Sequence, residues 1–174
     1  MKPRTAALIG FAIATLLVIT AGKKMTAALQ KIMNTKGAQY REIIAALEKA
    51  HGLPAGLLAA VAYRESRFNP KIINGQIKSP VGALGITQWM PSSAVWVGKN
   101  IMKKVFDPLN AEQALEASAY YLAWLNKQSG SWEKAIASYN WGLGNVQKKW
   151  PRLPAETRGY IEEIAMHTGI TKTI

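Results

Sequence analysis

Apolar residues recur every three or four positions along most of the chain, which is the period of an amphipathic helix. The clearest apolar stripe comprises Tyr40, Ile43, Ile44, Leu47 and Ala50. It ends before Gly52 and Pro54, as expected for a glycine that caps one helix and a proline that starts the next. We predict further helices over residues 54–67, 84–90, 92–104, 110–126, 131–140 and 155–167. Alternating strand patterns are scarce, so the predicted class is all-α, with at most a small hairpin in the 70s.

Two segments lack a strong helical pattern. Residues 68–83 contain two prolines, two glycines and two asparagines and are predicted as a long loop. Residues 25–37 are predicted as a weak helix or a linker. The chain of 174 residues is long enough for one domain with its own core. We assign that domain to residues 38–174.

Residues 1–24 differ from the rest of the chain in composition. Residues 5–22 carry no charge, and basic residues flank them on both sides. Their length is at the short end of what can span a bilayer as a helix. We predict that residues 1–24 are a hydrophobic membrane-targeting helix: a permanent anchor, a cleaved signal peptide, or a signal-anchor that later leaves the membrane. The alternative is a buried core helix.

Glu65 interrupts an apolar helix face. The residues that share this face by their spacing are Leu58, Val61, Ala62 and Glu65. Glutamate is rarely buried without a partner, and an apolar setting raises the pKa of a carboxyl group, which can then donate a proton near neutral pH. The alternative is a helix-end glutamate that forms a surface ion pair with Arg64 or Arg67.

The formal net charge of +12 indicates a polyanionic partner. Without residues 1–24 the chain keeps 18 basic and 10 acidic residues, a net charge of +8, so the rest of the chain is basic in its own right. Nucleic acid, an anionic membrane surface and cell-wall polymer are the candidates. The basic residues are scattered and no nucleic-acid-binding motif is present, so we do not expect nucleic acid as the partner.

Cysteine and histidine usage disfavours metal chemistry. The chain has no cysteine, so disulfides, cysteine-ligated zinc and thiol nucleophiles are excluded. The two histidines, His51 and His167, lie far apart in the sequence near predicted helix ends, where a cation suits the helix dipole. We therefore predict no metal site.

Two glycine-containing motifs offer polar and aromatic groups. In the loop around Gly82 and Gly85, closely spaced glycines let the backbone approach a ligand, and Gln88 offers an amide. Further on, a helix that ends in Tyr139 and Asn140 passes into a glycine turn. Aromatic faces and amides are typical of carbohydrate sites. The alternative for each motif alone is a core aromatic beside an ordinary helix cap.

Taken together and in order, the motifs resemble the soluble-lytic-transglycosylase domain, glycoside hydrolase family 23, over about residues 38–168. The motifs that carry the resemblance are Glu65-Ser66-x-Phe68-x-Pro70, Ser79-Pro80-x-Gly82-Ala83-x-Gly85-x-x-Gln88-x-Met90-Pro91, Tyr139-Asn140-x-Gly142-x-Gly144-x-Val146 and Leu153-Pro154-x-Glu156-Thr157-x-x-Tyr160. This family usually has Gly-Leu-Met-Gln where this chain has residues 85–88, Gly-Ile-Thr-Gln. The resemblance implies a compact lysozyme-like domain of several helices.

The resemblance also implies an activity. A lytic transglycosylase cleaves the β-1,4 bond between N-acetylmuramic acid and N-acetylglucosamine in peptidoglycan, and the muramoyl C6 hydroxyl closes on C1. Glu65 would be the single catalytic acid and base, with Tyr160 beside it. The residues implied along the glycan groove are Ser79, Gln88, Tyr139 and Asn140. No cofactor is implied, Ser66 is expected to be structural, and the protein is expected to be a monomer.

Two other functions remain open at this stage. A hydrolytic lysozyme of the goose type would need a second, water-activating acid, and Asp107 lies in a structural-looking motif. A non-enzymatic protein could bind the wall or disrupt the membrane through its cationic surface and its N-terminal helix. The expected location is the bacterial inner membrane facing the periplasm, or the periplasm or a virion after release. A role in phage lysis, virion entry or a secretion machine is compatible with all of these.

Overall fold

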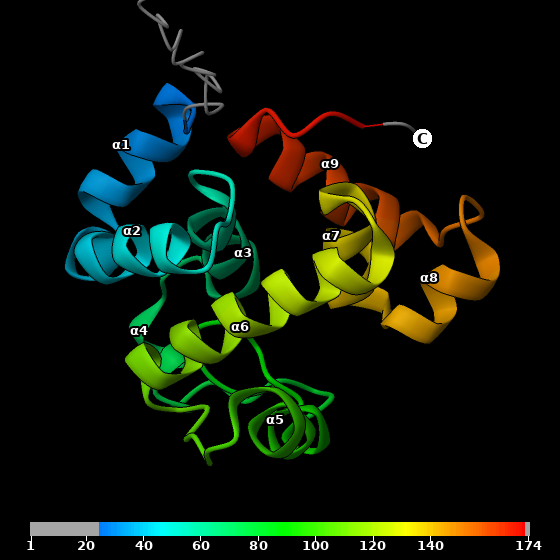
Figure 1. Ribbon diagram of the computed structural model, residues 1–174. Helices are drawn as coiled ribbons and strands as arrows, with labels where there is room; N and C mark the ends of the chain where they lie inside the picture. Colours follow the sequence, from blue (N-terminus) through cyan, green and yellow to red (C-terminus); the bar gives the residue numbers. More distant parts are fainter. Residues whose placement is uncertain (1–24, 173–174) are drawn as a thin grey trace, which may run out of the picture.

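The computed structural model describes residues 25–172, and helices account for the regular structure in this part of the chain (Figure 1), apart from one isolated β-bridge between Leu84 and Trp89. The elements in order are α1 (Ala27–Thr35), the 3-10 turn η1 (Ala38–Tyr40), α2 (Arg41–Ala50), α3 (Leu57–Ser66), α4 (Pro70–Ile73), α5 (Pro91–Val97), the π-helical turn η2 (Gly98–Met102), α6 (Ala111–Ser129), α7 (Trp132–Trp141), α8 (Leu143–Lys149) and α9 (Ala155–Thr168). The predicted all-α class is confirmed.

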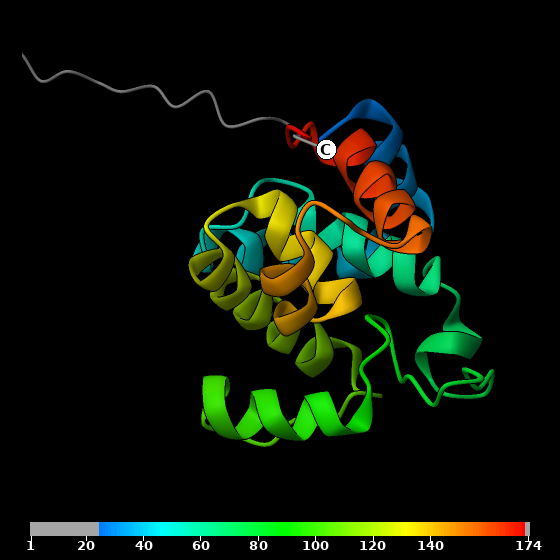
Figure 2. The same cartoon turned by 90° about the vertical axis from the view of Figure 1, so that its right-hand side faces the viewer.

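Helix α6 crosses the middle of the molecule and contacts α2, α3, α7, α8 and η2 (Figure 1). Helix α9, at the end of the chain, packs against α3 and α7. Helix α5 lies below the other helices in Figure 2, next to η2. This arrangement brings the end of α3, the end of α7 and the middle of α9 together, although they are far apart in the sequence.

Helix α3 is a core helix rather than an amphipathic surface helix. Its first six residues, 57–62, are all buried, so the apolar surface continues around the helix instead of forming one stripe. Only its last turn, which carries Glu65, is partly accessible. The sequence pattern therefore located Glu65 beside apolar residues correctly, but the helix is buried on more sides than the pattern indicated.

The start of α3 is held by a buried carboxylate on α2. The side chain of Glu48 accepts hydrogen bonds from the backbone N–H groups of Gly56, Leu58 and Ala59, at 2.8, 2.9 and 3.2 Å. These N–H groups at the start of a helix have no partner within it, and a carboxylate there also suits the helix dipole. Glu48 thereby fixes the position from which α3 extends toward Glu65.

Most predicted helices are confirmed within three residues at each end. The predictions for residues 110–126, 131–140 and 155–167 correspond to α6, α7 and α9, and the prediction for 92–104 corresponds to α5 followed by η2. The helix predicted to start at Pro54 begins three residues later, because Pro54 opens a turn in which its carbonyl accepts from Leu57 N–H. Helix α8 was not predicted.

Two local predictions are wrong. Residues 84–90 form a tight turn instead of a helix, because Gly85 and Gln88 have left-handed backbone angles and Leu84 and Trp89 exchange two backbone hydrogen bonds. This turn holds the bridge, and the structure has no hairpin among the residues in the 70s. The predicted long loop over residues 68–83 contains the short helix α4.

The amino-terminal predictions fall partly outside the described residues. The proposed membrane-targeting helix over residues 1–24 lies wholly outside them. Within residues 25–172, no helix combines the length and the apolar character needed to cross a membrane. The segment 25–37, predicted as a weak helix or a linker, contains α1, whose Leu29 and Met33 are buried in the core.

Candidate active site

Glu65 lies in the last turn of α3, where the chain turns sharply. Arg67 and Phe68, which follow the helix, both have left-handed backbone angles, with φ of 52° and 54°. The hydroxyl of Ser66 donates to the carbonyl of Ala62 at 2.9 Å and accepts from the N–H of Phe68 at 3.3 Å, so it is used inside the helix end. The prediction that Ser66 is structural is confirmed.

Tyr160 on α9 is the direct partner of Glu65. Its hydroxyl donates a hydrogen bond to Oε1 of Glu65 at 2.7 Å, across 95 residues of sequence. The ring of Tyr160 is buried, and burial raises the pKa of its hydroxyl well above 10, so it remains a neutral donor. The predicted position of Tyr160 beside Glu65 is confirmed.

The surroundings of Glu65 raise its pKa from 4.5 to about 7. Burial is the largest cause, and the negative charge of Glu156 adds to it. The hydrogen bond from Tyr160 and the positive charge of Arg64 lower the pKa and partly oppose the rise. Near neutral pH Glu65 therefore stays partly protonated, which suits a group that must donate a proton.

The arginines next to Glu65 in the sequence do not form an ion pair with it. Arg64 Nε lies 3.0 Å from Oε2 of Glu163 on α9, and Arg67 pairs with the other oxygen of the same carboxylate. The alternative interpretation, in which Glu65 belongs to a surface ion pair with these arginines, is wrong. Glu163 forms ion pairs with both arginines. The positive charge of Arg64 still lowers the pKa of Glu65, but without a direct ion pair.

Tyr139, at the end of α7, forms hydrogen bonds with Thr87 and Ser118. Its hydroxyl donates to the backbone carbonyl of Thr87 at 3.1 Å and lies 3.1 Å from the hydroxyl of Ser118 on α6. Ser118 in turn donates to the Thr87 hydroxyl at 2.9 Å. Burial, and then the charge of Glu65, raises the pKa of Tyr139. Tyr139 therefore lies within the electrostatic environment of Glu65 and ties α7 to the turn over residues 84–89.

This turn depends on the close approach of Gly85 to another backbone segment. A Cβ atom on Gly85 would lie 1.8 Å from the carbonyl oxygen of Pro108, whereas one on Gly82 would meet nothing within 4 Å. The sequence predicted that the backbone at Gly85 comes close to a ligand. In the structure it comes close to the backbone of Pro108 instead. Gln88 lies on the same turn and its amide donates to the Gly85 carbonyl at 2.8 Å.

The other two predicted site residues make contacts of different kinds. Asn140 accepts a hydrogen bond from the hydroxyl of Thr157 at 2.8 Å and so joins α7 to α9 close to Tyr160. Ser79 makes a local contact, since its hydroxyl accepts a hydrogen bond from the N–H of Val81 at 3.4 Å. The structure thus brings Glu65, Tyr139 and Tyr160 together, while the role of Ser79, Gln88 and Asn140 toward a ligand stays a prediction.

Sequence reasoning missed three residues of this region. Thr87 and Ser118 hold the Tyr139 hydroxyl, and Glu156 lies in the first turn of α9, where its charge acts on Glu65. The sequence did contain a signal for two of them. Thr87 is one of the positions at which this chain departs from the usual family sequence, and Glu156 belongs to the motif that begins at Leu153. Nothing in the local sequence distinguishes Ser118 from any other small polar residue on a helix.

Asp107 and the histidines have structural positions. The carboxylate of Asp107 accepts from the N–H of Leu109 at 2.9 Å, just before α6. His51 caps the end of α2 and His167 lies in the last turn of α9. Among the described residues, no three side chains of histidine, aspartate or glutamate are placed to hold a metal ion together.

Comparisons with known proteins agree with this geometry. Residues 42–158 match the protein family described as Transglycosylase SLT domain. The chain is 31% identical over 126 residues to Membrane-bound lytic murein transglycosylase F 2 of Alkalilimnicola ehrlichii, an alignment that covers 68% of this chain and 26% of that protein. It is 36% identical over 118 residues to Peptidoglycan transglycosylase gp16 of Escherichia phage T7, with 67% of this chain and 8% of that protein covered.

A solved structure supports the same fold. The 70 kDa soluble lytic transglycosylase of Escherichia coli superposes with a TM-score of 0.62 and 27% identity, over 74% of this chain and 23% of that chain. The predicted lysozyme-like arrangement of a soluble-lytic-transglycosylase domain is confirmed. The chain spans about a quarter or less of the length of these three proteins.

Proposed function

We propose that this chain, which belongs to the transglycosylase SLT domain family, is a peptidoglycan lytic transglycosylase. Its substrate is the β-1,4 bond between N-acetylmuramic acid and N-acetylglucosamine, and its product carries a 1,6-anhydromuramoyl end. The observation that carries this proposal is the partly buried Glu65, with its pKa near 7 and its hydrogen bond from Tyr160. The relatives named lytic murein transglycosylase and peptidoglycan transglycosylase support the choice of substrate.

The proposed reaction uses one carboxyl group twice. Protonated Glu65 first donates its proton to the glycosidic oxygen, and the bond from that oxygen to C1 of the muramoyl ring breaks. The resulting carboxylate then takes the proton of the C6 hydroxyl, whose oxygen bonds to C1. Glu65 ends protonated, so no water is consumed. Tyr160 donates to Oε1 and so orients the carboxyl group throughout, leaving the other oxygen for the substrate.

The remaining predicted residues belong to the proposed glycan groove. Tyr139 holds the turn over residues 84–89 against α7, and Gln88 lies on that turn. Asn140 and Ser79 complete the predicted set of substrate contacts. Because the domain is basic, the carboxylates of the peptide stems would add an attraction that depends on salt. We propose no cofactor and a monomeric enzyme.

One observation favours keeping hydrolysis as a second candidate. Glu156 is exposed and close enough for its charge to raise the pKa of Glu65. An inverting glycosidase needs a second carboxylate that activates water, and Glu156 is the acid that the structure offers for this role. Asp107 is held by the loop before α6 instead.

Product analysis separates the two reactions. We expect mass spectrometry of purified sacculi digested by this protein to give muropeptides with 1,6-anhydro ends and no new reducing ends. The reason is that the carboxylate of Glu65, once formed, accepts the C6 hydroxyl proton without a second acid. Glu156→Gln is the matched variant, and it should leave the anhydro products unchanged. Reducing ends that disappear in Glu156→Gln would instead establish hydrolysis.

The pH dependence should follow the proton on Glu65. Since the free enzyme must begin with protonated Glu65, kcat/KM is expected to be level below pH 7 and to fall about tenfold per pH unit above it. Tyr160→Phe removes a hydrogen bond that lowers the pKa of Glu65, so the fall should move to higher pH. Tyr120→Phe, which changes a tyrosine that packs on His51, serves as the control. An unmoved pH profile in Tyr160→Phe would contradict the assignment.

The cellular setting is a further part of the proposal. Residues 5–22 would target the protein to the inner membrane, with the domain facing the periplasm, or would later release it to the periplasm or a virion. A relative named membrane-bound and a relative from a phage support the two versions. Fractionation of the full-length chain before and after membrane depolarisation distinguishes a releasable signal-anchor from a permanent one.

A further inference from the structure

The carboxylate of Glu163 on α9 binds both arginines that stand next to Glu65 in the sequence. Its Oε2 lies 3.0 Å from Nε of Arg64, and its Oε1 accepts a hydrogen bond from Arg67. The side chain of Glu163 is only 22% exposed, so solvent screens these two contacts incompletely. Glu163 also follows Tyr160 by three residues on α9, which places the two side chains on one face of the helix. Glu163 therefore connects the end of α3 to the face of α9 that carries the partner of Glu65.

This contact determines where the guanidinium of Arg64 lies. Its Cζ is 5.6 Å from the centroid of the Tyr160 ring, an arrangement in which a cation is attracted to the ring face. The hydroxyl of the same ring donates a hydrogen bond to Oε1 of Glu65 at 2.7 Å. Arg64 is thus close to the carboxyl group of Glu65, with one ring between them, but it does not pair with it.

The charges around Glu65 show why the position of Arg64 matters. Apart from burial, the groups that act on this carboxyl group are Tyr160 and Glu156 on α9 and Arg64 on α3, and Arg64 is the positive one among them. Tyr139 on α7 is a neutral neighbour whose own hydroxyl responds to Glu65. A guanidinium in direct contact with a carboxyl group favours its charged form. It would also occupy the oxygen that must reach the glycosidic bond.

We propose that Glu163 is a positioning residue for the reaction of Glu65, because it binds Arg64 and Arg67 and keeps the Arg64 guanidinium over the Tyr160 ring instead of against the Glu65 carboxyl group. This inference rests on the proposed function, since the position of Arg64 affects the rate only if Glu65 must begin the reaction protonated. Glu163 acts through Arg64 and exchanges no proton with the substrate.

The test follows the proton on Glu65 directly, in the full chain. Carbon-13 NMR of labelled glutamate side chains gives the titration midpoint of Glu65, whose signal is the one missing from Glu65→Gln. Glu163→Gln keeps the size of the side chain but removes its charge, so the released Arg64 should lower this midpoint by about 0.5 to 1 pH unit. Above pH 7, kcat/KM should then fall about three- to tenfold, because a shift of one unit changes the protonated fraction tenfold.

A second substitution identifies Arg64 as the cause. Adding Arg64→Gln to Glu163→Gln should return the midpoint to the wild-type value or above it, because no guanidinium is left to approach Glu65. Adding Arg67→Gln instead should leave the midpoint low. A purely structural role of Glu163 would not produce this difference between the two arginines. Glu163→Asp, whose shorter side chain holds both arginines less closely, should give a smaller shift in the same direction and serves if Glu163→Gln does not fold.

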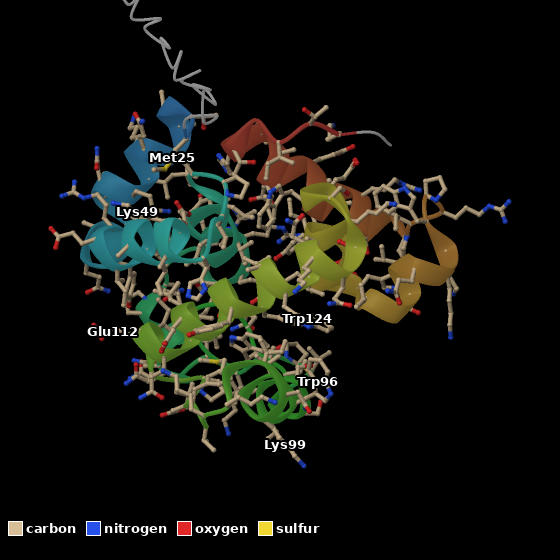
Figure 3. The ribbon with its side chains drawn as sticks, in the orientation of Figure 1. Met25, Lys49, Trp96, Lys99, Glu112 and Trp124 are labelled. Carbon is tan, nitrogen blue, oxygen red and sulfur yellow. The ribbon has the colours of Figure 1, made fainter. Side chains whose placement is uncertain are left out.

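A matched control removes a carboxylate elsewhere. Figure 3 shows Glu112 beside the start of α6, well away from α9, and Glu112→Gln should leave the midpoint of Glu65 unchanged. An unchanged midpoint in folded Glu163→Gln would overturn the role of Glu163, and so would a lowered midpoint that Arg64→Gln does not reverse. Absence of anhydro products from the wild-type chain would refute the proposed function instead, while the NMR titration would still decide whether Glu163 controls the proton on Glu65.

Discussion

Replacing Glu65 with glutamine is expected to abolish cleavage of peptidoglycan, with a loss of at least about 1,000-fold in rate. The amide has nearly the shape of the carboxyl group, but it can neither donate a proton to the glycosidic oxygen nor accept one from the C6 hydroxyl. In the proposed reaction both transfers use this one group, so its loss removes both steps. Release of soluble muropeptides from sacculi measures the loss.

A matched control separates this effect from a general change of charge. Glu162→Gln makes the same substitution on an exposed position of α9 and should leave the rate within about twofold of wild type. If Glu65→Gln kept more than about a tenth of the wild-type rate, the single-carboxyl reaction would be refuted.

The same substitution should also stabilise the fold at alkaline pH. The pKa of Glu65 is about 7 in the folded chain and near 4.5 when exposed, so the unfolded state loses its proton first as the pH rises. The free energy of unfolding of the wild type therefore falls between about pH 4.5 and pH 7 and stays lower above that. Glutamine does not titrate, so at pH 8 we expect Glu65→Gln to be more stable by about 2 kcal/mol, allowing for partial exposure.

Urea unfolding at two pH values measures this gain. At pH 4 both proteins carry a neutral side chain at position 65, and their free energies of unfolding should agree within about 0.5 kcal/mol. A variant that is inactive and more stable at pH 8 would show that Glu65 is retained for chemistry at the cost of stability. Equal stability at both pH values would show that the pKa of Glu65 is not raised.

The helices were predictable because their signals are local. The stripe that ends at Gly52 and the cap residues Asn110 and Ser131 act within one or two turns, and each side-chain cap is present in the structure. The turn over residues 84–89 was not predictable in this way. Its apolar residues have helical spacing, but Ile86 and Trp89 are buried by packing with distant segments, and left-handed angles at Gly85 and Gln88 replace the helix.

The site was predictable only in part for the same reason. Glu65 was visible because an acid among apolar residues is a local anomaly, and the resemblance supplied Tyr160 from 95 residues away. Glu48 gives no such signal, since its position in α2 looks like an ordinary helical glutamate. Its three backbone partners become apparent only when α2 and α3 are packed together. Long-range polar contacts of this kind need the fold.

Replacing Gly85 with alanine is expected to destabilise the fold by more than about 3 kcal/mol and to remove activity with it. The new methyl group would lie 1.8 Å from the backbone carbonyl oxygen of Pro108, and a backbone segment cannot rotate away as a side chain can. Either the turn or the loop before α6 must move. Because the Thr87 carbonyl accepts from the Tyr139 hydroxyl, a shifted turn would also displace Tyr139 near Glu65.

Gly82→Ala is the control that isolates the clash. Gly82 and Gly85 have nearly the same backbone angle, with φ of 79° and 77°, so alanine suffers the same left-handed strain of about 1 kcal/mol at both positions. A methyl group on Gly82 meets nothing within 4 Å. Thermal unfolding and sacculus digestion should therefore show a small loss for Gly82→Ala and a large one for Gly85→Ala. Equal losses would mean that backbone angle, rather than contact with Pro108, is the reason for glycine at position 85.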